Sequence, residues 1–403
     1  MLHLHNTASR LYVRYRRAVL HIDRPAAAVI EAPVSTVEGW FALAVQRADI
    51  SLRIGGREAR WSAMRREPVE ALFGPNRSRG FRVILDLNQF QDLNGRVAID
   101  LVVNGAVAAT KQLMIAPAVS VNPERWLEIR RRKQDWLQAN AACPNCASYE
   151  LAFVDDQIRC ARCGATFSNR GLVLDFLPPN VKDKFRIEDC EDISANEYDT
   201  TAQRLIEEVR RAGGKVLDCG SGFKTAVDET VIGLDVAPFP AVDVLAVNQR
   251  LPFRDAVFDA VFSLNVLEHV TDPFASAGEL VRVLKPGGRL YCCIPFLQPE
   301  HGYPDHYFNA TRSGLRQLFR DRLELLSHEV PRSGEPVWTL HWFLSRYAEH
   351  LTDEERREFL ALRVRDILNE PVEALIDKPW VTKLADGGKW KLASTTSAIF
   401  RKP

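Results

Sequence analysis

The sequence predicts a multidomain protein: an α/β doubly wound domain preceded by an all-β sandwich and a small cysteine-rich segment. Three observations support this order. Short alternating runs such as FRVILDL and RVAIDLVV fill the stretch from Tyr12 to Pro117, and two CxxC pairs follow them. After Asp183, helical and strand patterns alternate to the end of the sequence. Such alternation is typical of a parallel sheet covered by helices.

The length of 403 residues is large for one domain, so several domains are expected. The predicted parts are a β-sandwich at 1–118, a helical linker at 119–140, the cysteine segment at 141–178, and the α/β domain at 179–403. An extra helical insertion is predicted at about 332–389. Its apolar faces suit a lid, a dimer contact or a membrane-edge surface, and the sequence does not choose between them.

The formal net charge of +1 creates no global field that attracts nucleic acid or an anionic membrane. The first residues lack the apolar core and the cleavage site of a signal peptide, and no apolar run is long enough for a membrane span. We therefore expect a cytoplasmic protein without a transmembrane segment. Nucleic acid is disfavoured as a partner but not excluded, because a local basic patch could still bind it.

Two tight-turn signals, Gly55-Gly56 and Asn104-Gly105, separate strand-like runs in the N-terminal region. The pattern predicts a β-sandwich. This region resembles the β-sandwich modules of some glycan-modifying transferases, although it contains no motif that names a ligand. A scaffolding or interaction role is therefore favoured over specific carbohydrate binding.

A charged helical stretch begins at Pro123 and carries the basic run from Arg130 to Lys133. Trp126, Leu127, Ile129 and Trp136 form one apolar face, so we expect the four basic side chains to lie in water. A contact with RNA or phospholipid is the alternative for this run.

Two CxxC pairs, separated by thirteen residues, follow the linker. Four thiolates from two tight knuckles can surround one Zn²⁺ tetrahedrally and leave no position open for catalysis. The predicted ligands are Cys143, Cys146, Cys160 and Cys163. The segment resembles a zinc ribbon, and we expect a structural role for the metal because so short a segment buries little core. Redox-active or unliganded pairs are the alternative.

The motif KVLDCGSGFK, residues 215–224, places an acidic, glycine-spaced turn directly after a buried strand. Glycine allows a close backbone approach to a ligand at the carboxyl end of such a strand. Asp218, two residues before Gly220, would repel a pyrophosphate at this turn, and Thr225 stands where a dinucleotide motif has its third glycine. The charge suits S-adenosylmethionine, whose amino group and sulfonium are cationic.

Three further motifs follow in order: VIGLDVAP, which ends a strand at Asp235; LPFRDAVFDAVFSLNVLEHVTDP; and ELVRVLKPGGRLYCCIPF. An acid at the end of the second strand can accept both hydroxyls of a ribose. The ordered set strongly resembles the class I S-adenosylmethionine-dependent methyltransferases, which are Rossmann-like, within the group that acts on small molecules, lipids, quinones and sugars. The resemblance extends from about Asp183 onward.

This resemblance implies that S-adenosyl-L-methionine is the cofactor, with Gly220 and Gly222 at its methionine portion and Asp235 at its ribose. The remaining implied cofactor residues are Asp218, Cys219, Ser221, Asn248 and Asn265. The chain departs from the family pattern twice. Lys224 replaces the third glycine of the turn, and Asn248 lies where an acid often meets the adenine amino group. The Asn248 amide oxygen can accept the same hydrogen bond.

Methyl transfer is an in-line displacement that depends on alignment, and a hydroxyl or amine acceptor benefits from a general base. The loop LQPEHGYPDHYFNATRSGL, which resembles the family's substrate-side loop, supplies His306 as the favoured base with Asp305 or Tyr303 as partners. His269, next to the fourth strand of the sheet, is a second candidate, and a loop-capping role is its alternative. The aromatic and polar residues of the loop could also simply pack it against the sheet.

The leading prediction is an active methyltransferase that methylates oxygen or nitrogen of a small molecule, a saccharide or a lipid-linked glycan. One alternative is an rRNA or tRNA methyltransferase that uses the zinc ribbon for recognition. The other is a non-catalytic methyltransferase-like binding protein. The acceptor and the oligomeric state are not determined by the sequence.

Overall fold

The structure is a computed structural model, and most of the chain is described by it. The described residues are 18–43, 48–59, 61–64, 67–74, 77–90, 93–170, 172–184, 197–224, 226–302 and 305–394. The chain divides into two compact units. One comprises residues 1–264 and 279–292, and the other comprises residues 265–278 and 293–403. The predicted last strand, ASTTSAIFRKP, lies almost entirely outside the described residues.

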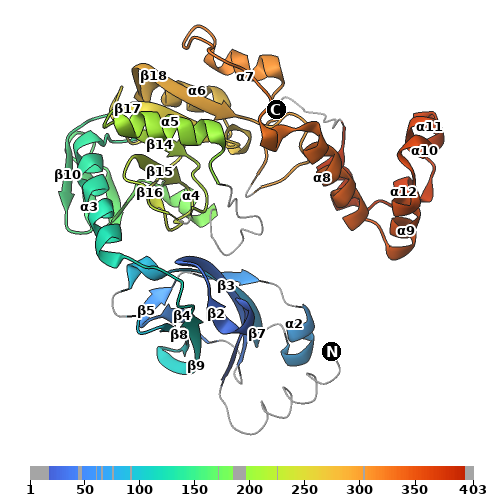
Figure 1. The fold of residues 1–403 in the computed structure, drawn as a ribbon, viewed down its shortest axis with the longest axis horizontal. Coiled ribbons are helices and arrows are strands. Elements are labelled where there is room, and N and C mark those ends of the chain that lie inside the picture. Colours follow the sequence, from blue (N-terminus) through green and yellow to red (C-terminus); the bar gives the residue numbers. More distant parts are fainter. Residues whose placement is uncertain are drawn as a thin grey trace, which may run out of the picture. The chain divides into compact units, whose positions relative to one another are not determined.

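The N-terminal part of the first unit is rich in β-structure and forms two sheets (Figure 1). One sheet has the order β1 (Ala18–Arg24), β3 (Val34–Leu43), β7 (Ser78–Asp86) and β6 (Trp61–Met64). The other has the order β2 (Val29–Ile30), β9 (Ala106–Ile115), β8 (Arg96–Val103), β4 (Ile50–Ile54) and β5 (Arg57–Ala59). Phe41 and Phe81 from the first sheet and Leu52 and Leu101 from the second are buried in one hydrophobic cluster, which joins the two sheets.

The predicted hairpin turn lies between β8 and β9. Asn104 and Gly105 have φ angles of 48° and 81°, and Val103 pairs with Ala106. Positive φ at both central residues matches the twist of the flanking strands, which explains why an Asn-Gly pair specifies this turn. The short helix α2 (Glu67–Phe73) also belongs to this region.

A nine-stranded sheet follows in the same unit, with the order β10-β11-β12-β13-β16-β15-β14-β17-β18. Its central strands are β16 (Val242–Leu245), β15 (Val231–Asp235), β14 (Val216–Cys219) and β17 (Phe258–Leu264), and neighbours among these four pair in parallel. The chain winds from β14 to β15 and β16 on one side and then crosses to β17 on the other. This reversal at β14 is a topological switch point, where ligands bind in open α/β sheets.

The helix α5 (Thr200–Arg211) covers the sheet at this switch point (Figure 1). Its apolar residues Ala202, Leu205, Ile206 and Val209 form a buried cluster with side chains of β14, β15 and β17. Asp199 caps the helix by accepting a hydrogen bond from the Ala202 N–H at 2.8 Å. β18 (Leu284–Cys293) includes Pro286, Gly287 and Gly288 of the KPGG sequence.

The cysteine segment extends this sheet through four strands: β10 (Leu151–Val154), β11 (Gln157–Cys160), β12 (Thr166–Arg170) and β13 (Val173–Asp175). The first three pairings are antiparallel, whereas β13 pairs in parallel with β16, placing Leu174 opposite Val244. The sequence did not predict this link. It makes the cysteine hairpin an extension of the α/β sheet, and the short helix α4 (Pro179–Lys184) follows it.

The expectation that the whole basic run of the linker lies in water was wrong. In α3 (Pro123–Asn140), Arg130 and Lys133 are 4% and 2% exposed, whereas Arg131 and Arg132 are exposed. The reason is Asp243 of β16, a buried acid whose two oxygens lie 2.6 Å from the Arg130 Nη1 and 2.6 Å from the Lys133 Nζ. The Arg130 guanidinium also donates to the carbonyl of Val242 at 2.9 Å. Half of the run is therefore used within the protein, which weakens the case for RNA contact.

The second unit is largely helical. Its helices are α7 (Arg312–Phe319), α8 (Pro336–Glu349), α9 (Asp353–Ala361), α10 (Val364–Leu368), α11 (Val372–Leu375), α12 (Pro379–Thr382) and α13 (Asp386–Leu392) (Figure 1). Leu351, Phe359, Trp380 and Leu384 form its buried cluster. The helix α6 (Pro273–Val283) is divided between the two units. None of the described helices combines the length and the apolar character that crossing a membrane requires.

Candidate functional site

The glycine turn after β14 is held by the end of β15. Gly220 and Gly222 have φ angles of 73° and 62°, a left-handed conformation that glycine adopts without strain. The N–H groups of Gly220 and Ser221 donate to the carbonyl oxygen of Leu234 at 2.8 and 3.0 Å, and the Gly222 N–H donates to Asp235 Oδ2 at 2.9 Å. These three amides are committed within the protein, so the turn does not offer them to a bound phosphate.

Asp235, the last residue of β15, is 8% exposed and its second oxygen accepts the Ala237 N–H at 2.9 Å. Burial raises the pKa of this carboxyl group to about 6, although the backbone hydrogen bonds from Ala237 and Gly222 oppose the shift. The nearby carboxyl group of Asp218 adds to it. The predicted acid is therefore fixed in position at the edge of the turn, and its charge state changes near neutrality.

Asp218 has two partners that the sequence did not reveal. The Tyr198 hydroxyl donates to Asp218 Oδ2 at 2.5 Å, and the Lys224 ammonium lies 4.8 Å from the centroid of the Tyr198 ring. Burial raises the pKa of Asp218, while the Tyr198 hydroxyl and the Lys224 charge lower it. Tyr198 directly precedes Asp199, the cap residue of α5. This position next to the cap is the sequence signal that places Tyr198 near the sheet. Lys224, noted as a departure from the glycine pattern, thus adds positive charge beside this acid.

The other residues of the predicted cofactor set belong to different parts of the structure: Cys219, Ser221 and Asn248 are buried in the first unit, and Asn265 belongs to the second. Cys219 is buried at the end of β14, and burial raises the pKa of its thiol. Ser221 and Asn248 are 4% and 6% exposed, and the buried Ser221 hydroxyl has no hydrogen-bond partner among the described residues. Asn265 belongs to the second unit, where it adopts a φ of 56° and its N–H donates to the Cys293 carbonyl at 3.0 Å.

The predicted catalytic histidines gather in the second unit. The ring of His301 lies 5.2 Å from that of His269 and 4.5 Å from that of His306, centroid to centroid. His306 Nε2 lies 3.0 Å from Asn309 Oδ1 and 3.2 Å from the carbonyl of Phe308. Tyr303, a predicted partner of this histidine, lies outside the described residues. The loop therefore forms a three-histidine cluster, of which the sequence selected His269 and His306.

Asp305, the other predicted partner, joins this cluster through its backbone. Its carbonyl oxygen lies 2.9 Å from His269 Nδ1, and its carboxylate accepts the Tyr307 hydroxyl at 2.6 Å. Burial lowers the pKa of His269, and the charge of the neighbouring His306 lowers it further. The hydrogen bond to the Asp305 backbone opposes this shift. His269 is thus favoured in its neutral form, which can accept a proton.

Glu268 precedes His269 and received no specific role from the sequence. Its side chain is 0% exposed, and both carboxylate oxygens have no hydrogen-bond partner among the described residues. Burial raises the pKa of this carboxyl group to about 8. A buried carboxyl group without a partner is costly to a fold and calls for a physical explanation.

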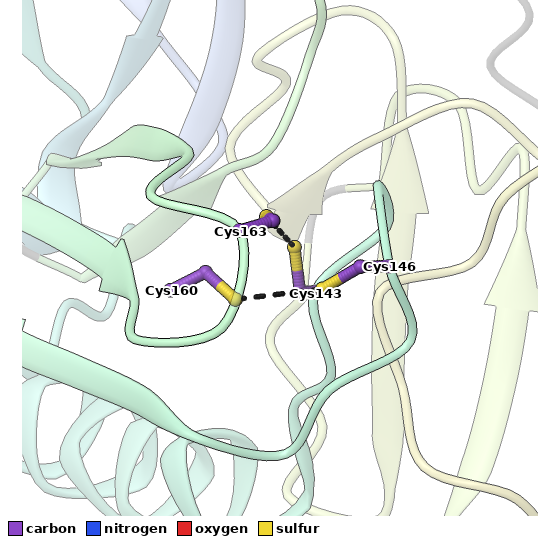
Figure 2. Close-up of side chains that lie close together, drawn as sticks. All are labelled: Cys143, Cys146, Cys160 and Cys163. Atoms are coloured by element: carbon purple, nitrogen blue, oxygen red, sulfur yellow. Dashed lines mark hydrogen bonds between the residues drawn. The ribbon is translucent and has the colours of Figure 1, made fainter.

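The four cysteines of the two pairs converge, as Figure 2 shows. All four Sγ atoms lie within 4.8 Å of one another, with separations of 3.6 Å between Cys143 and Cys163 and 3.6 Å between Cys146 and Cys160. A tetrahedral Zn²⁺ with Zn–S bonds of about 2.3 Å separates its sulfur atoms by roughly 3.8 Å. The thiols of the predicted ligand set therefore lie at spacings that fit one zinc ion.

The two knuckles have the same backbone form. The Ala147 N–H donates to the Cys143 carbonyl at 2.8 Å, and the Gly164 N–H donates to the Cys160 carbonyl at 3.0 Å. Ala147 and Gly164 have φ angles of 56° and 71°, so alanine adopts here the conformation that glycine adopts in the other knuckle. Alanine in place of glycine thus leaves the backbone form of the first knuckle unchanged.

Comparison with known proteins supports a methyltransferase assignment for the sheet region. The family described as "Methyltransferase domain" matches residues 218–292. This span runs from the acid of the glycine turn to β18. Residues 218–292 are therefore similar to a methyltransferase domain.

Two curated relatives illustrate the similarity. A protein of Mycolicibacterium smegmatis named as a probable S-adenosylmethionine-dependent methyltransferase is 36% identical over 152 residues, which are 33% of this chain and 58% of the relative. An uncharacterized methyltransferase of Mycobacterium tuberculosis is 32% identical over 129 residues, 26% of this chain and 50% of the relative. The chain thus spans little more than half the length of these relatives.

Among solved structures, phosphoethanolamine N-methyltransferase 2 of Haemonchus contortus, in complex with S-adenosyl-L-methionine, is 19% identical with a TM-score of 0.25. The match covers 45% of this chain and 48% of that chain.

Proposed function

We propose that this protein is an S-adenosyl-L-methionine-dependent methyltransferase that methylates oxygen or nitrogen of a small molecule, a saccharide or a lipid-linked glycan. One observation carries the choice of donor. The turn after β14 presents the buried acid Asp218 while its three amides are held by Leu234 and Asp235. Such a turn favours a cationic ligand over a diphosphate, which would need those amides as donors.

The proposed donor site uses the carboxyl end of the sheet. Gly220 and Gly222 keep the backbone free of side chains where the methionine portion would lie, and Asp218 supplies negative charge near its cationic groups. Asp235 accepts the ribose hydroxyls with the lone pairs that its two backbone hydrogen bonds leave. Cys219 and Ser221 line the turn, Asn248 accepts from the adenine amino group, and Asn265, the residue that follows β17 along the chain, completes the proposed set. The donor, when bound, supplies an activated methyl group.

On the acceptor side, the loop histidines are the proposed bases. The neutral form of His269 is favoured, and His306 is held by Asn309 and Phe308 in one orientation. A positioned imidazole that removes a proton from an acceptor hydroxyl or ammonium accelerates transfer by about 10²- to 10⁴-fold. Tyr303 and Asp305 remain the proposed partners of this step.

A structural Zn²⁺ is proposed for the four cysteines, which supply four sulfur ligands and no open position. Since β13 of this segment pairs with β16, a metal that fixes the hairpin also supports the edge of the α/β sheet. The small-molecule, saccharide or glycan acceptor is inferred from the sequence motifs and from the β-rich region that precedes the sheet.

Substitution of Asp235 by Asn tests the proposed donor site. Asp235→Asn keeps the size of the side chain and removes its charge together with one acceptor, so we expect S-adenosyl-L-methionine to bind at least about tenfold more weakly, equivalent to 1.4 kcal/mol. Isothermal titration calorimetry on the full chain measures the change.

Asp175→Asn is the matched control. Asp175 is a buried acid at the end of β13 that accepts the N–H of Leu177, two residues on, as Asp235 accepts that of Ala237. This control should destabilise the fold comparably and leave donor affinity unchanged in the folded protein. Equal affinity in Asp235→Asn and the native chain would show that the ribose is held elsewhere.

A further inference from the structure

The buried carboxyl group of Glu268 lies beside two imidazoles of the same unit. One ligand atom each from Glu268, His269 and His301 lies within 4.8 Å of the others. Glu268 Oε1 and His269 Nε2 are 3.9 Å apart. When a metal binds tetrahedral ligands at about 2.0–2.2 Å, the ligand atoms lie roughly 3.4 Å from one another. The three ligand atoms therefore need to move closer together by roughly 1.4 Å at most to bind one ion.

The tautomers of the two histidines are set by backbone carbonyls. His269 Nδ1 lies 2.9 Å from the Asp305 carbonyl, and His301 Nδ1 lies 2.8 Å from the Pro299 carbonyl. A carbonyl accepts only from a protonated nitrogen, so in the neutral ring each Nδ1 carries the hydrogen and each Nε2 keeps a lone pair. Metal-binding histidines have this arrangement, in which the second nitrogen donates to a carbonyl that orients the ring.

His306 is adjacent but does not share this arrangement. Its Nδ1 accepts the His301 N–H at 3.3 Å, and its Nε2 faces the Phe308 carbonyl and Asn309 Oδ1. Its nitrogens thus contact groups of the loop rather than Glu268. His269 and His301 belong to the group with Glu268, whereas His306 does not.

Packing holds the two histidines in place. A Cβ built on Gly302, whose φ is 86°, would lie 2.3 Å from His269 Cε1, so only glycine lets the chain pass over this ring. The Trp342 ring of α8 lies 4.9 Å from the His301 ring, centroid to centroid. Preorganised ring positions reduce the loss of freedom on binding a ligand.

We propose that Glu268, His269 and His301 form a second metal site in this chain, which takes a divalent transition metal such as Zn²⁺. A metal on His269 Nε2 takes the lone pair that a base would use, so in the metal-bound protein His306 is the proposed base. Two imidazoles and one carboxylate are a ligand set of zinc and non-haem iron sites that keep a coordination position open. The Glu268 carboxylate, which is fully buried and has no hydrogen-bond partner among the described residues, gains a counter-charge from the ion. The site differs from the four-cysteine cluster in its ligands and in its open position.

Counting Zn²⁺ sites tests the proposal on the full chain. The metal-free protein is titrated with Zn²⁺ alone against a chromophoric chelator, and metal content after dialysis is measured by mass spectrometry. The native chain should bind one more equivalent than His301→Ala. Glu268→Gln, which keeps the shape of the side chain, should weaken the same equivalent by about tenfold or more.

His306→Ala is the matched control, because it removes a neighbouring imidazole that is not a ligand. This variant should retain the equivalent that His301→Ala loses, and added Zn²⁺ should raise its melting temperature as much as that of the native chain. Equal Zn²⁺ counts in the native chain and His301→Ala, or loss of the equivalent in His306→Ala, would overturn the proposal. The count does not involve the methyl donor, so it stands apart from the proposed function.

Discussion

The two acids of the proposed donor site differ in their partners. Asp218 accepts a hydrogen bond from the Tyr198 hydroxyl, whereas Asp235 accepts hydrogen bonds from the backbone amides of Gly222 and Ala237. Burial raises the pKa of Asp235 to about 6. Because the pKa of about 6 in the folded protein lies above the unfolded value of 3.8, the contribution of Asp235 to folding stability is full below pH 3.8 and is lost as the pH rises from 3.8 to about 6. Ionisation of Asp235 creates the acceptor that the ribose requires.

Donor affinity should therefore depend on pH. Titration of one carboxyl group with a pKa of about 6 makes the ionised fraction about tenfold larger at pH 7 than at pH 5, and we expect S-adenosyl-L-methionine affinity to rise by up to that factor. The Asp218 carboxyl group, which also faces this acid, adds to the upward shift of the pKa. Calorimetric titrations across this range measure the effect. Asp235→Asn should show a flat profile, and an identical slope in both proteins would assign the titration to another group.

Several residue-level features follow from the sequence because they are local. Turns and knuckles depend on a few adjacent residues, as the Asn104-Gly105 turn and the two CxxC knuckles illustrate. Tyr198 and Glu268 were not selected because their roles depend on what surrounds them. A tyrosine twenty residues before an acid carries no spacing signal, and burial of a carboxyl group is not visible in a loop motif.

At the level of elements, α3 shows where sequence patterns fail. Residues 130–133 are all basic, so the sequence gives no pattern that shows which of these side chains are buried. Their partner Asp243 lies within the apolar run AVDVLAV. Only the pairing of β16 in the sheet interior reveals that this acid is buried and attracts Arg130 and Lys133. Lys133 accordingly has its pKa lowered by burial, with Asp243 acting in the opposite direction.

Removing this acid should destabilise the first unit. Asp243→Asn leaves two buried cations without a counter-charge and weakens the bond to the Gly233 N–H, now 2.9 Å from Asp243 Oδ2. We expect a loss of about 3–5 kcal/mol in the free energy of unfolding, measured by urea denaturation. Glu128→Gln, which breaks an exposed ion pair with Arg132, is the matched control and should leave the free energy of unfolding almost unchanged. A comparable small change in both variants would show that the buried cluster contributes little.

For the whole molecule, the sequence predicted an α/β region preceded by a β-rich region and a four-cysteine cluster, because helix and strand periods and CxxC spacing are visible along the chain. The boundaries of these three regions stay predictions. The parallel pairing of β13 with β16 was not foreseeable, since strand neighbours far apart in sequence are chosen by the fold as a whole. The match to the methyltransferase domain family covers residues 218–292, so the roles of the β-rich region and of α8 to α13 are open to experiment.

The account depends on the charge of the turn after β14, and paired calorimetric titrations test it most directly. The full chain is titrated with S-adenosyl-L-methionine and, in the same buffer, with a nicotinamide adenine dinucleotide. We predict saturable binding of the sulfonium compound and no detectable heat from the dinucleotide. Binding of the dinucleotide alone would contradict the account.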